Sequence, residues 1–139
     1  MVFFFDTNIL FYAVDSRFPD KQTTALALYT KTTTEGSFIT STQVLAEFYN
    51  ATTKGAQPLL QRHEARIQVT SLARQRVIAT TASMVVGATA LAERYQLQWW
   101  DAMVLQAALS AGADCLYSED MQHGQRFDTL TVVNPFLTA

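Results

Sequence analysis

The chain has 139 residues, 49% hydrophobic and 16% charged, which suffices for one sizeable core and is too short for two. Its 10 Lys and Arg against 12 Asp and Glu give a formal net charge of −2, unlike the basic balance of a typical nucleic-acid clamp. No apolar run approaches the roughly 20 residues of a membrane span, and the start lacks the features of a signal peptide. We therefore expect a single cytoplasmic domain over residues 1–139, with no membrane partner.

Short apolar strands alternate with longer helical stretches along the chain, which predicts an α/β fold with parallel pairing. In chain order the expected elements are a strand at 2–5, a turn or short helix from 8, a helix at 20–34, a strand at 37–40, a helix opened by a T-x-x-Q capping box at 40–43, a helix at 58–73, a strand at 77–79, a helix at 82–95, a helix at 100–111, and strands at 115–117 and 130–133. The single cysteine, Cys115, excludes an internal disulfide and is expected to be a buried structural thiol.

Acidic residues follow two of these strands. The run at 2–5 is apolar on both faces, as in the central strand of a parallel sheet, and Asp6 follows it directly. Glu119 and Asp120 come just after the strand at 115–117. In open parallel sheets ligands bind beyond the carboxyl ends of the strands, so we expect these side chains to project into one crevice.

Two further acids lie at helix edges. On a helix opened at residue 40, Glu47 falls roughly 60° outside the arc formed by the apolar positions 44, 45, 48 and 49. Asp101 lies in the first turn of its helix and flanks the apolar positions 103, 104, 107 and 108. Both side chains can therefore reach the rim of the same crevice, and five carboxylates could converge there.

Each acid also has an ordinary structural interpretation. Asp6 could cap the following helix, and Glu47 or Asp101 could be solvated. Their joint placement favours a metal site, because gathered carboxylates raise one another's pKa unless a cation compensates them. Oxygen-only ligands select hard ions, Mg²⁺ or Mn²⁺. With the acids neutralised by metal, the remaining surface would be net basic, so the net charge does not exclude a nucleic-acid substrate.

Four motifs resemble the PIN-domain ribonucleases, and among them the VapC-type toxins of bacterial toxin–antitoxin pairs. They are F-F-F-D-T-N-I-L at 3–10, S-T-Q-V-L-A-E-F-Y at 41–49, W-D-A-M-V-L-Q-A-A at 100–108 and L-Y-S-E-D-M-Q-H-G at 116–124. The resemblance covers almost the whole chain and implies a three-layer α/β/α domain with a parallel sheet of about five strands. It implies an acidic quartet around Mg²⁺ or Mn²⁺, supported by hydrogen bonds from three neighbouring side chains. The quartet is Asp6, Glu47, Asp101 and Asp120, and the supporting residues are Thr7, Asn8 and Ser118.

The roles of two further residues in the fourth motif stay open. Glu119 is a less certain supporting residue, and His123 is expected to anchor a loop rather than to reach the metal or substrate. By resemblance, the activity is endonucleolytic hydrolysis of RNA to leave a 5′-phosphate, by a metal-bound water of lowered pKa. Transfer RNA and other structured RNAs are the expected substrates. The implied partners are a VapB-type antitoxin and a second copy of the chain.

Three alternatives are weighed against this interpretation. A haloacid-dehalogenase-like phosphatase needs a second Asp two residues after the first, where this chain has Asn8. A phosphoacceptor receiver domain needs a late lysine, and no lysine follows Lys54. The third alternative is a catalytically silent protein of the same fold that only binds RNA or antitoxin; the intact quartet argues against it.

Three surface features have less certain roles. The Trp99–Trp100 pair is expected to belong to the core or a subunit contact, although a stacking platform for bases is the alternative. Phe48–Tyr49 and the helix after Asp20 are candidate antitoxin-facing surfaces. A cluster of arginines is interpreted either as a solvated helix face or as part of a basic surface for RNA. It comprises Arg62, Arg66, Arg74 and Arg76.

Overall fold

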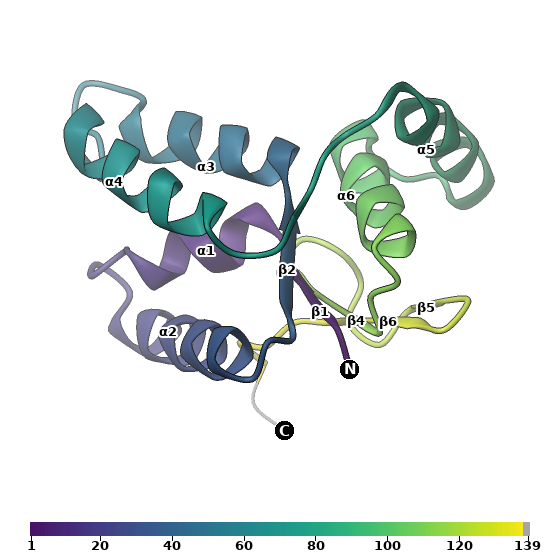
Figure 1. Ribbon diagram of the computed structural model, residues 1–139, viewed down its shortest axis with the longest axis horizontal. Coiled ribbons are helices and arrows are strands. Elements are labelled where there is room, and N and C mark those ends of the chain that lie inside the picture. The colour runs from purple at the N-terminus through teal and green to yellow at the C-terminus, as the bar shows by residue number, and fades with distance from the viewer. Residues whose placement is uncertain (138–139) are drawn as a thin grey trace.

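A computed structural model describes residues 1–137, so the last two residues of the expected 1–139 domain lie outside the described residues. Within that range helices and strands alternate along the chain (Figure 1). In chain order they are β1 (Phe3–Phe5), α1 (Thr7–Ala13), α2 (Pro19–Thr34), β2 (Phe38–Ser41), α3 (Thr42–Thr53), α4 (Arg62–Ala73), β3 (Val77–Ile78), α5 (Ala82–Tyr95), α6 (Trp99–Ser110), β4 (Cys115–Tyr117), β5 (Arg126–Phe127) and β6 (Leu130–Val133). Across residues 1–137, none of these helices has the length and apolar content needed to cross a membrane.

The strands form one sheet in the order β3-β2-β1-β4-β6-β5. All neighbouring pairs are parallel except β5 and β6, which are antiparallel. Strand β1 is central, as expected from its apolar faces: Phe4 pairs with Ile39 on one side and Leu116 on the other, and Phe4 and Phe5 are both fully buried. The expected parallel sheet is confirmed, with the short β5 added at one edge.

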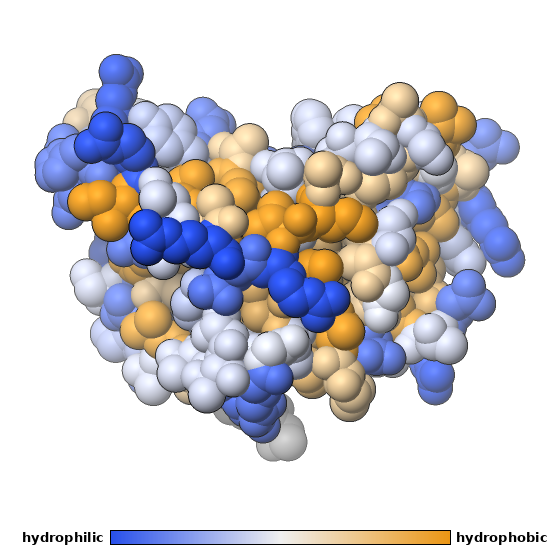
Figure 2. All heavy atoms as spheres, in the orientation of Figure 1, coloured by the Kyte–Doolittle hydropathy of each residue, from blue (hydrophilic) through white to orange (hydrophobic). Residues whose placement is uncertain are grey.

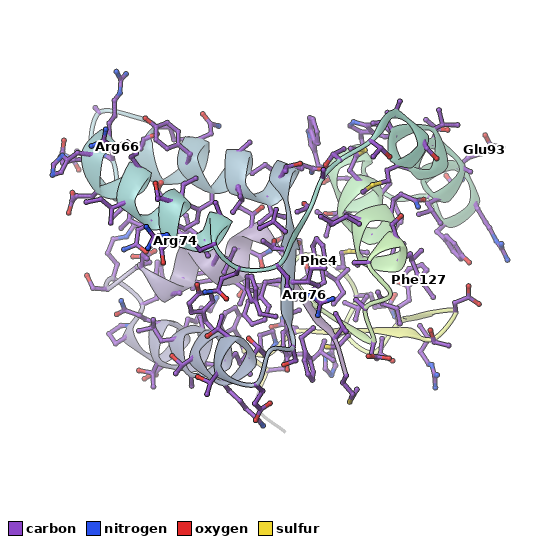
Figure 3. The ribbon with its side chains drawn as sticks, viewed as in Figure 1. Phe4, Arg66, Arg74, Arg76, Glu93 and Phe127 are labelled. Atoms are coloured by element: carbon purple, nitrogen blue, oxygen red, sulfur yellow. The ribbon has the colours of Figure 1, made fainter. Side chains whose placement is uncertain are left out.

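Helices cover both faces of the sheet. Figure 1 shows α1, α2, α3 and α4 on one side and α5 and α6 on the other, and both α2 and α6 contact β2. Figure 3 places Phe4 of β1 between the two helical groups. The α/β/α arrangement expected from the sequence is therefore confirmed.

The chain path places a crevice beside β1. From β1 the chain adds β2 and then β3 on one side, whereas β4 and β6 extend the sheet on the other side. The strand order therefore reverses between β1 and β4, and at such switch points ligands bind beyond the carboxyl ends of the strands. Asp6 follows β1 and Ser118 follows β4, so both lie at this point.

The start of α3 differs from the expected capping box at 40–43. Ser41 is the N-cap, and its Oγ accepts a hydrogen bond from the Val44 N–H at 3.2 Å. Thr40 is instead the third residue of β2, where its hydroxyl donates to the Phe5 carbonyl at 2.9 Å. The prediction of the box was wrong because the strand continues one residue further than expected and the next hydroxyl takes the cap position.

The start of α4 and the strand β5 also differ from expectation. The helix begins at Arg62 rather than at position 58, because Leu60 donates its N–H to the Thr52 carbonyl at 2.8 Å in a loop. Glu64 accepts from the Gln61 N–H at 2.9 Å, so a capping box does occur, but at this helix. Strand β5 was not expected, and the other elements agree with the predicted ranges to within about one residue at either end.

Candidate functional site

Asp6 is the buried centre of the site, only 5% exposed. One carboxylate oxygen caps α1 by accepting from the Thr7 N–H at 2.7 Å, and the other accepts from the Ser118 hydroxyl at 2.8 Å. Burial raises the pKa of Asp6 to about 7; these two hydrogen bonds oppose the rise, and the charges of Asp120 and Glu47 add to it. The capping and site interpretations of Asp6 are therefore compatible, and the metal-free carboxylate is strained electrostatically.

Asp101 and Asp120 complete a close cluster with Asp6. Each of the three offers a carboxylate oxygen, and these oxygens all lie within 4.8 Å of one another. Burial, followed by the charges of Asp120 and Glu47, raises the pKa of Asp101 above its usual range. Asp120 is exposed, and its carboxylate accepts from the Asn8 amide at 2.9 Å. The three acids come from the ends of β1 and β4 and from the first turn of α6.

Glu47 lies at the rim of this cluster rather than inside it. Its carboxylate accepts from the Thr7 hydroxyl at 2.8 Å and from the Gln43 amide at 2.6 Å. The charge of Glu47 raises the pKa of both Asp6 and Asp101, so it is close enough to interact with the cluster electrostatically. The structure thus brings together three of the four predicted acids directly and attaches the fourth through Thr7.

The donor set fits a hard divalent cation. All three cluster ligands are carboxylate oxygens, which Mg²⁺ and Mn²⁺ prefer. Burial first, and repulsion from the neighbouring acids second, raise the pKa values of Asp6 and Asp101, so the metal-free site disfavours both carboxylates. A bound cation would favour the ionised forms and remove that repulsion. Clusters of exposed acids are weak evidence for a metal site, but Asp6 in this cluster is buried.

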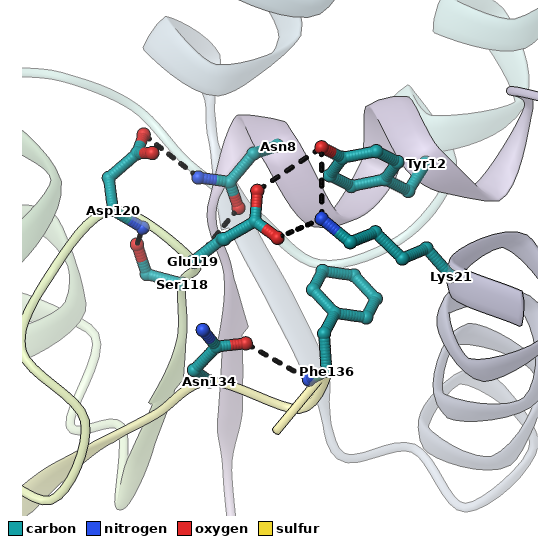
Figure 4. A network of polar contacts seen from close by, with 8 residues as sticks. All are labelled: Asn8, Tyr12, Lys21, Ser118, Glu119, Asp120, Asn134 and Phe136. Atoms are coloured by element: carbon teal, nitrogen blue, oxygen red, sulfur yellow. Dashed lines mark hydrogen bonds and ion pairs between the residues drawn. The ribbon is translucent and has the colours of Figure 1, made fainter. Parts of the chain in front are cut away.

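The predicted supporting residues divide into two groups. Thr7, Asn8 and Ser118 each donate a hydrogen bond to one of the acids, as the resemblance implied. Glu119 instead directs its carboxylate to Tyr12 and Lys21, outside the acid cluster (Figure 4). Lys21 lies 2.5 Å from Glu119, and their hydrogen bond raises the pKa of Lys21. The Glu119 side chain therefore belongs to a separate network that borders the site.

The sequence prediction missed Gln43, Tyr12 and Lys21. Gln43 lies four residues before Glu47 and Tyr12 four residues after Asn8, spacings that put each pair on one helix face. That spacing was an available signal. No local pattern points to Lys21, because it comes from α2 and meets the site only through the tertiary fold.

Cys115 is a buried thiol, as expected, and His123 makes a contact that fits the expected loop anchor. Cys115 is buried, and burial raises the pKa of its thiol to about 12, as suits a structural residue. His123 Nδ1 accepts a hydrogen bond from the Asn134 N–H at 3.0 Å, which anchors the loop before β5. Neither side chain takes part in the acid cluster.

Two expectations for aromatic residues were wrong in part. Phe48 is 1% exposed, so only Tyr49 of that pair can face a partner. Trp100 is 60% exposed and Trp99 37%, so neither belongs to the core of the single chain. Trp100 lines an open hollow of about 510 Å³ together with four residues of α3 beside the acid cluster: Gln43, Ala46, Glu47 and Asn50. The other two interpretations of the tryptophans, a subunit contact and a base-stacking platform, stay predictions.

The predicted arginine cluster forms an exposed basic face. Arg62 and Arg66 border a hollow with Tyr49 and His63. Figure 3 places Arg66 on α4, Arg74 at the end of the helix and Arg76 just beyond it. Figure 2 shows strongly hydrophilic side chains where Arg74 and Arg76 lie. All four arginines are exposed, so this face is available to an anionic partner.

The fold and the site together define a class: α/β/α proteins that gather carboxylates at the switch point of a parallel sheet. The chain belongs to the PIN domain family, whose model matches residues 3–126. No curated protein matches its sequence.

Solved structures share the fold. VapC20 of Mycobacterium tuberculosis, a sarcin-ricin loop cleaving toxin, aligns with a TM-score of 0.68 at 18% identity over 85% of this chain and 89% of its own. A toxin–antitoxin complex from Klebsiella pneumoniae aligns with 0.68 at 20% identity over 96% and 97%. VapBC2 of Rickettsia felis, bound to promoter DNA, aligns with 0.68 at 17% identity over 95% and 97%. At these identities the likeness shows the fold.

Proposed function

We propose that this protein is a Mg²⁺- or Mn²⁺-dependent endoribonuclease, the VapC-type toxin of a toxin–antitoxin pair, built as a single PIN domain over residues 1–139. The observation that carries the proposal is the cluster of Asp6, Asp101 and Asp120, with carboxylate oxygens within 4.8 Å of one another at the switch point of the sheet. Membership of the PIN domain family supports it. RNA in the cytoplasm is the expected substrate.

The metal-holding and catalytic residues in this proposal are Asp6, Glu47, Asp101 and Asp120. A bound cation would lower the pKa of a water and neutralise charge on the scissile phosphate. The chain itself orients the ligands: Ser118 and the Thr7 N–H hold Asp6, Asn8 holds Asp120, and the hydroxyl of Thr7 holds Glu47. Asp6 must lose its proton to bind a cation, so metal binding is expected to release a proton near neutral pH.

The substrate class is RNA, with transfer RNA or another structured RNA as the expected target. The similar VapC20 is a toxin that cleaves the sarcin-ricin loop, an RNA element, which supports this class. The basic face of α4 gives the protein a surface for phosphates despite its formal net charge of −2. While one RNA phosphodiester is cleaved at the acid cluster, other phosphates of the same RNA would contact this basic face.

The proposed partners are a VapB-type antitoxin and a second copy of the chain. Similar structures include a toxin–antitoxin complex and VapBC2, which supports the antitoxin. Val86, Trp99 and Trp100 are exposed apolar residues of α5 and α6, and such residues are common where subunits meet. Sedimentation equilibrium of the purified protein alone tests the proposed homodimer. A monomer at micromolar concentration would contradict it.

The test is cleavage of total cellular RNA by purified, antitoxin-free protein with Mn²⁺ or Mg²⁺, with and without EDTA, followed by mapping of new 5′ ends. We expect discrete cuts that disappear in EDTA and in Asp101→Asn, because that variant loses one ligand of the cluster. Asp128→Asn is the matched control: Asp128 is exposed with φ 57° in the turn between β5 and β6, a conformation that asparagine also accepts.

The outcome also decides the alternative function. A catalytically silent PIN-fold protein that binds RNA or antitoxin would bind without cutting. Well-folded protein that shows a metal-induced rise in melting temperature but gives no new 5′ ends from any RNA pool would favour that alternative.

A further inference from the structure

Both carboxylate oxygens of Glu119 accept hydrogen bonds from residues outside the acid cluster. One oxygen accepts from the Tyr12 hydroxyl at 3.2 Å and the other from the Lys21 ammonium at 2.5 Å. Lys21 also donates to the Tyr12 hydroxyl at 3.3 Å, which closes a three-membered ring of contacts (Figure 4). The negative charge next to Asp120 is thereby compensated by a cation of the chain itself.

The backbone of the same loop is fastened to the same helix. The Glu119 N–H donates to the Asn8 side-chain oxygen at 3.2 Å, and the Asn8 amide nitrogen donates to Asp120 at 2.9 Å. Asn8 and Tyr12 are four residues apart on α1 and so share one face. Main chain and side chain of Glu119 are thus both tied to α1, one residue before Asp120.

Lys21 is itself held in place by aromatic rings. Its ammonium lies 4.5 Å from the centroid of Tyr12 and 5.4 Å from that of Phe136. The Tyr12 and Phe136 rings meet edge to face at 5.2 Å, and the Asn134 side chain accepts from the Phe136 N–H at 3.0 Å. The ion pair is partly shielded, with side chains 35% and 26% exposed, so it is less screened than a surface pair.

We propose that Tyr12, Lys21 and Glu119 form a positioning network that clamps residues 118–120 onto α1 and so keeps Asp120 in the acid cluster. The inference rests on the proposed function, because Asp120 matters there as a metal-holding residue. Mutation of a residue that orients a metal ligand without itself binding the metal commonly changes metal affinity by about 10- to 100-fold. Glu119 then acts through Asp120, and Lys21 acts through Glu119.

Two other roles would use the same residues. If Glu119 were itself a metal ligand, its loss would weaken metal binding, whereas loss of Lys21 would leave the metal affinity unchanged or increase it. If Lys21 contacted a substrate phosphate, its loss would raise the KM for RNA and leave the metal affinity unchanged. The positioning network alone predicts that the two losses have the same effect on metal affinity.

The experiment titrates Mn²⁺ into metal-free Lys21→Met, Glu119→Met and the double variant, following the melting temperature. We expect the apparent Mn²⁺ affinity to fall about tenfold in each single variant, and no further in the double variant, because both singles break the same contact. Lys21→Arg should retain most of the affinity. Lys31→Met is the matched control, an exposed lysine on the same helix α2 without an ion pair among the described residues.

Two further readouts test the inference: the first tests a substrate contact of Lys21, and the second is independent of the proposed function. In cleavage assays at saturating Mn²⁺, Lys21→Met should leave the KM for RNA unchanged. Amide hydrogen exchange at 118–120 in metal-free protein should be faster in Lys21→Met than in Lys31→Met, a result that needs neither metal nor RNA. Unchanged exchange, unchanged Mn²⁺ affinity in Lys21→Met, or loss of affinity in Glu119→Met alone would each overturn the network. A wild type without any Mn²⁺ response would instead contradict the proposed metal site.

Discussion

Asp6 is in conflict with its surroundings as long as no cation is bound. The residue is placed to cap α1 and to receive the Ser118 hydroxyl, both of which favour a carboxylate. Burial next to other acids disfavours the same charge more strongly, which is why its pKa is raised to about 7. Asp6 therefore lowers the free energy of unfolding of the metal-free protein, and a bound divalent cation would raise it again. Such local destabilisation is expected of a functional site.

This conflict gives a pH prediction for the metal-free protein. The folded pKa of Asp6, about 7, lies above its ordinary value of 3.8, so the folded state binds the proton more tightly than the unfolded state. Stability from this group is present below the ordinary pKa, declines as pH rises through about 7, and then stays low. We expect Asp6→Asn to remove that decline and to be more stable than wild type at pH 8.5 by about 1–4 kcal/mol.

Urea unfolding in EDTA at pH 5.5 and 8.5 measures the effect. Asp128→Asn serves as the control and should keep the wild-type pH dependence, because it removes an exposed carboxylate that is not part of the cluster. The same slope in Asp6→Asn and wild type would contradict the raised pKa. With Mn²⁺ added, the wild type should gain stability and Asp6→Asn much less.

At the residue scale, the sequence identified acids at strand ends better than acids on helices. Asp6 and Asp120 follow strands whose carboxyl ends share one edge, so their proximity follows from parallel pairing. Glu47 was expected to reach the rim of the crevice from its helical angle, and the structure has it at the rim of the acid cluster, hydrogen-bonded to Thr7. Lys21 was not predictable, because its partner Glu119 is 98 residues away along the chain.

At the scale of elements, the junction between β2 and α3 determines where Glu47 lies. Ser41 is fully buried, ends β2 and caps α3, while the Thr40 hydroxyl ties the junction to the carbonyl of Phe5 beside Asp6. A change in the start of α3 would rotate Glu47 relative to Asp6, because each residue added or removed turns the helix by about 100°. The junction therefore positions part of the site.

Replacing this cap gives a stability prediction. We expect Ser41→Ala to lower the free energy of unfolding by about 1–2 kcal/mol, because the Val44 N–H loses its acceptor in a buried setting. Gln43→Ala, which would break the box predicted from the sequence, should cost under about 0.5 kcal/mol, because Gln43 contacts Glu47 and does not cap the helix. Denaturant unfolding of both variants compares the two assignments; a larger loss in Gln43→Ala would contradict the observed cap.

The elements that the sequence mispredicted share a cause. Thr40 and Ser41 are adjacent hydroxyl residues, either of which satisfies the cap chemistry, and only the length of β2 chooses between them. Pro58 is compatible with a first helical turn, but the chain needs residues up to Gln61 to return from α3 to α4. Strand β5 consists of Arg126 and Phe127 and lacks the apolar β-branched run that identified the equally short β3. Long helices and apolar strands were predictable because their patterns repeat.

For the molecule as a whole, the separation of charge matters more than the net value. Residues 61–78 contain Arg62, Arg66, Arg74 and Arg76 against Glu64 alone, although the chain is formally −2. The acids that give the negative total include the site cluster, which a cation would neutralise. Sequence composition alone therefore hides a basic face that the fold gathers on α4 and the segment leading to β3. The exposure of Trp99 and Trp100 was likewise not predictable from the sequence, because an apolar pattern does not distinguish a core face from a subunit face.

The basic face gives a prediction for RNA binding. Arg62 and Arg66 lie one turn apart on α4 and border the same hollow. If they contact phosphates, Arg62→Gln with Arg66→Gln should weaken binding of every RNA alike and reduce the slope of log Kd against log salt by roughly 0.7 for each arginine lost. Arg94→Gln, which removes an exposed arginine of α5 on the other side of the sheet, should leave that slope unchanged.

Binding is measured in the Asp101→Asn background, so that the RNA stays intact, between about 50 and 200 mM salt. The two-arginine variant and the Arg94 variant have different amounts of removed charge, so each single variant, Arg62→Gln and Arg66→Gln, is compared with Arg94→Gln at equal net charge. An equal slope in all three would mean that binding depends on total charge, and α4 would then be only a solvated face. A reduced slope confined to the α4 variants would locate the RNA on the helix layer that also contains Glu47, because α3 packs against α4.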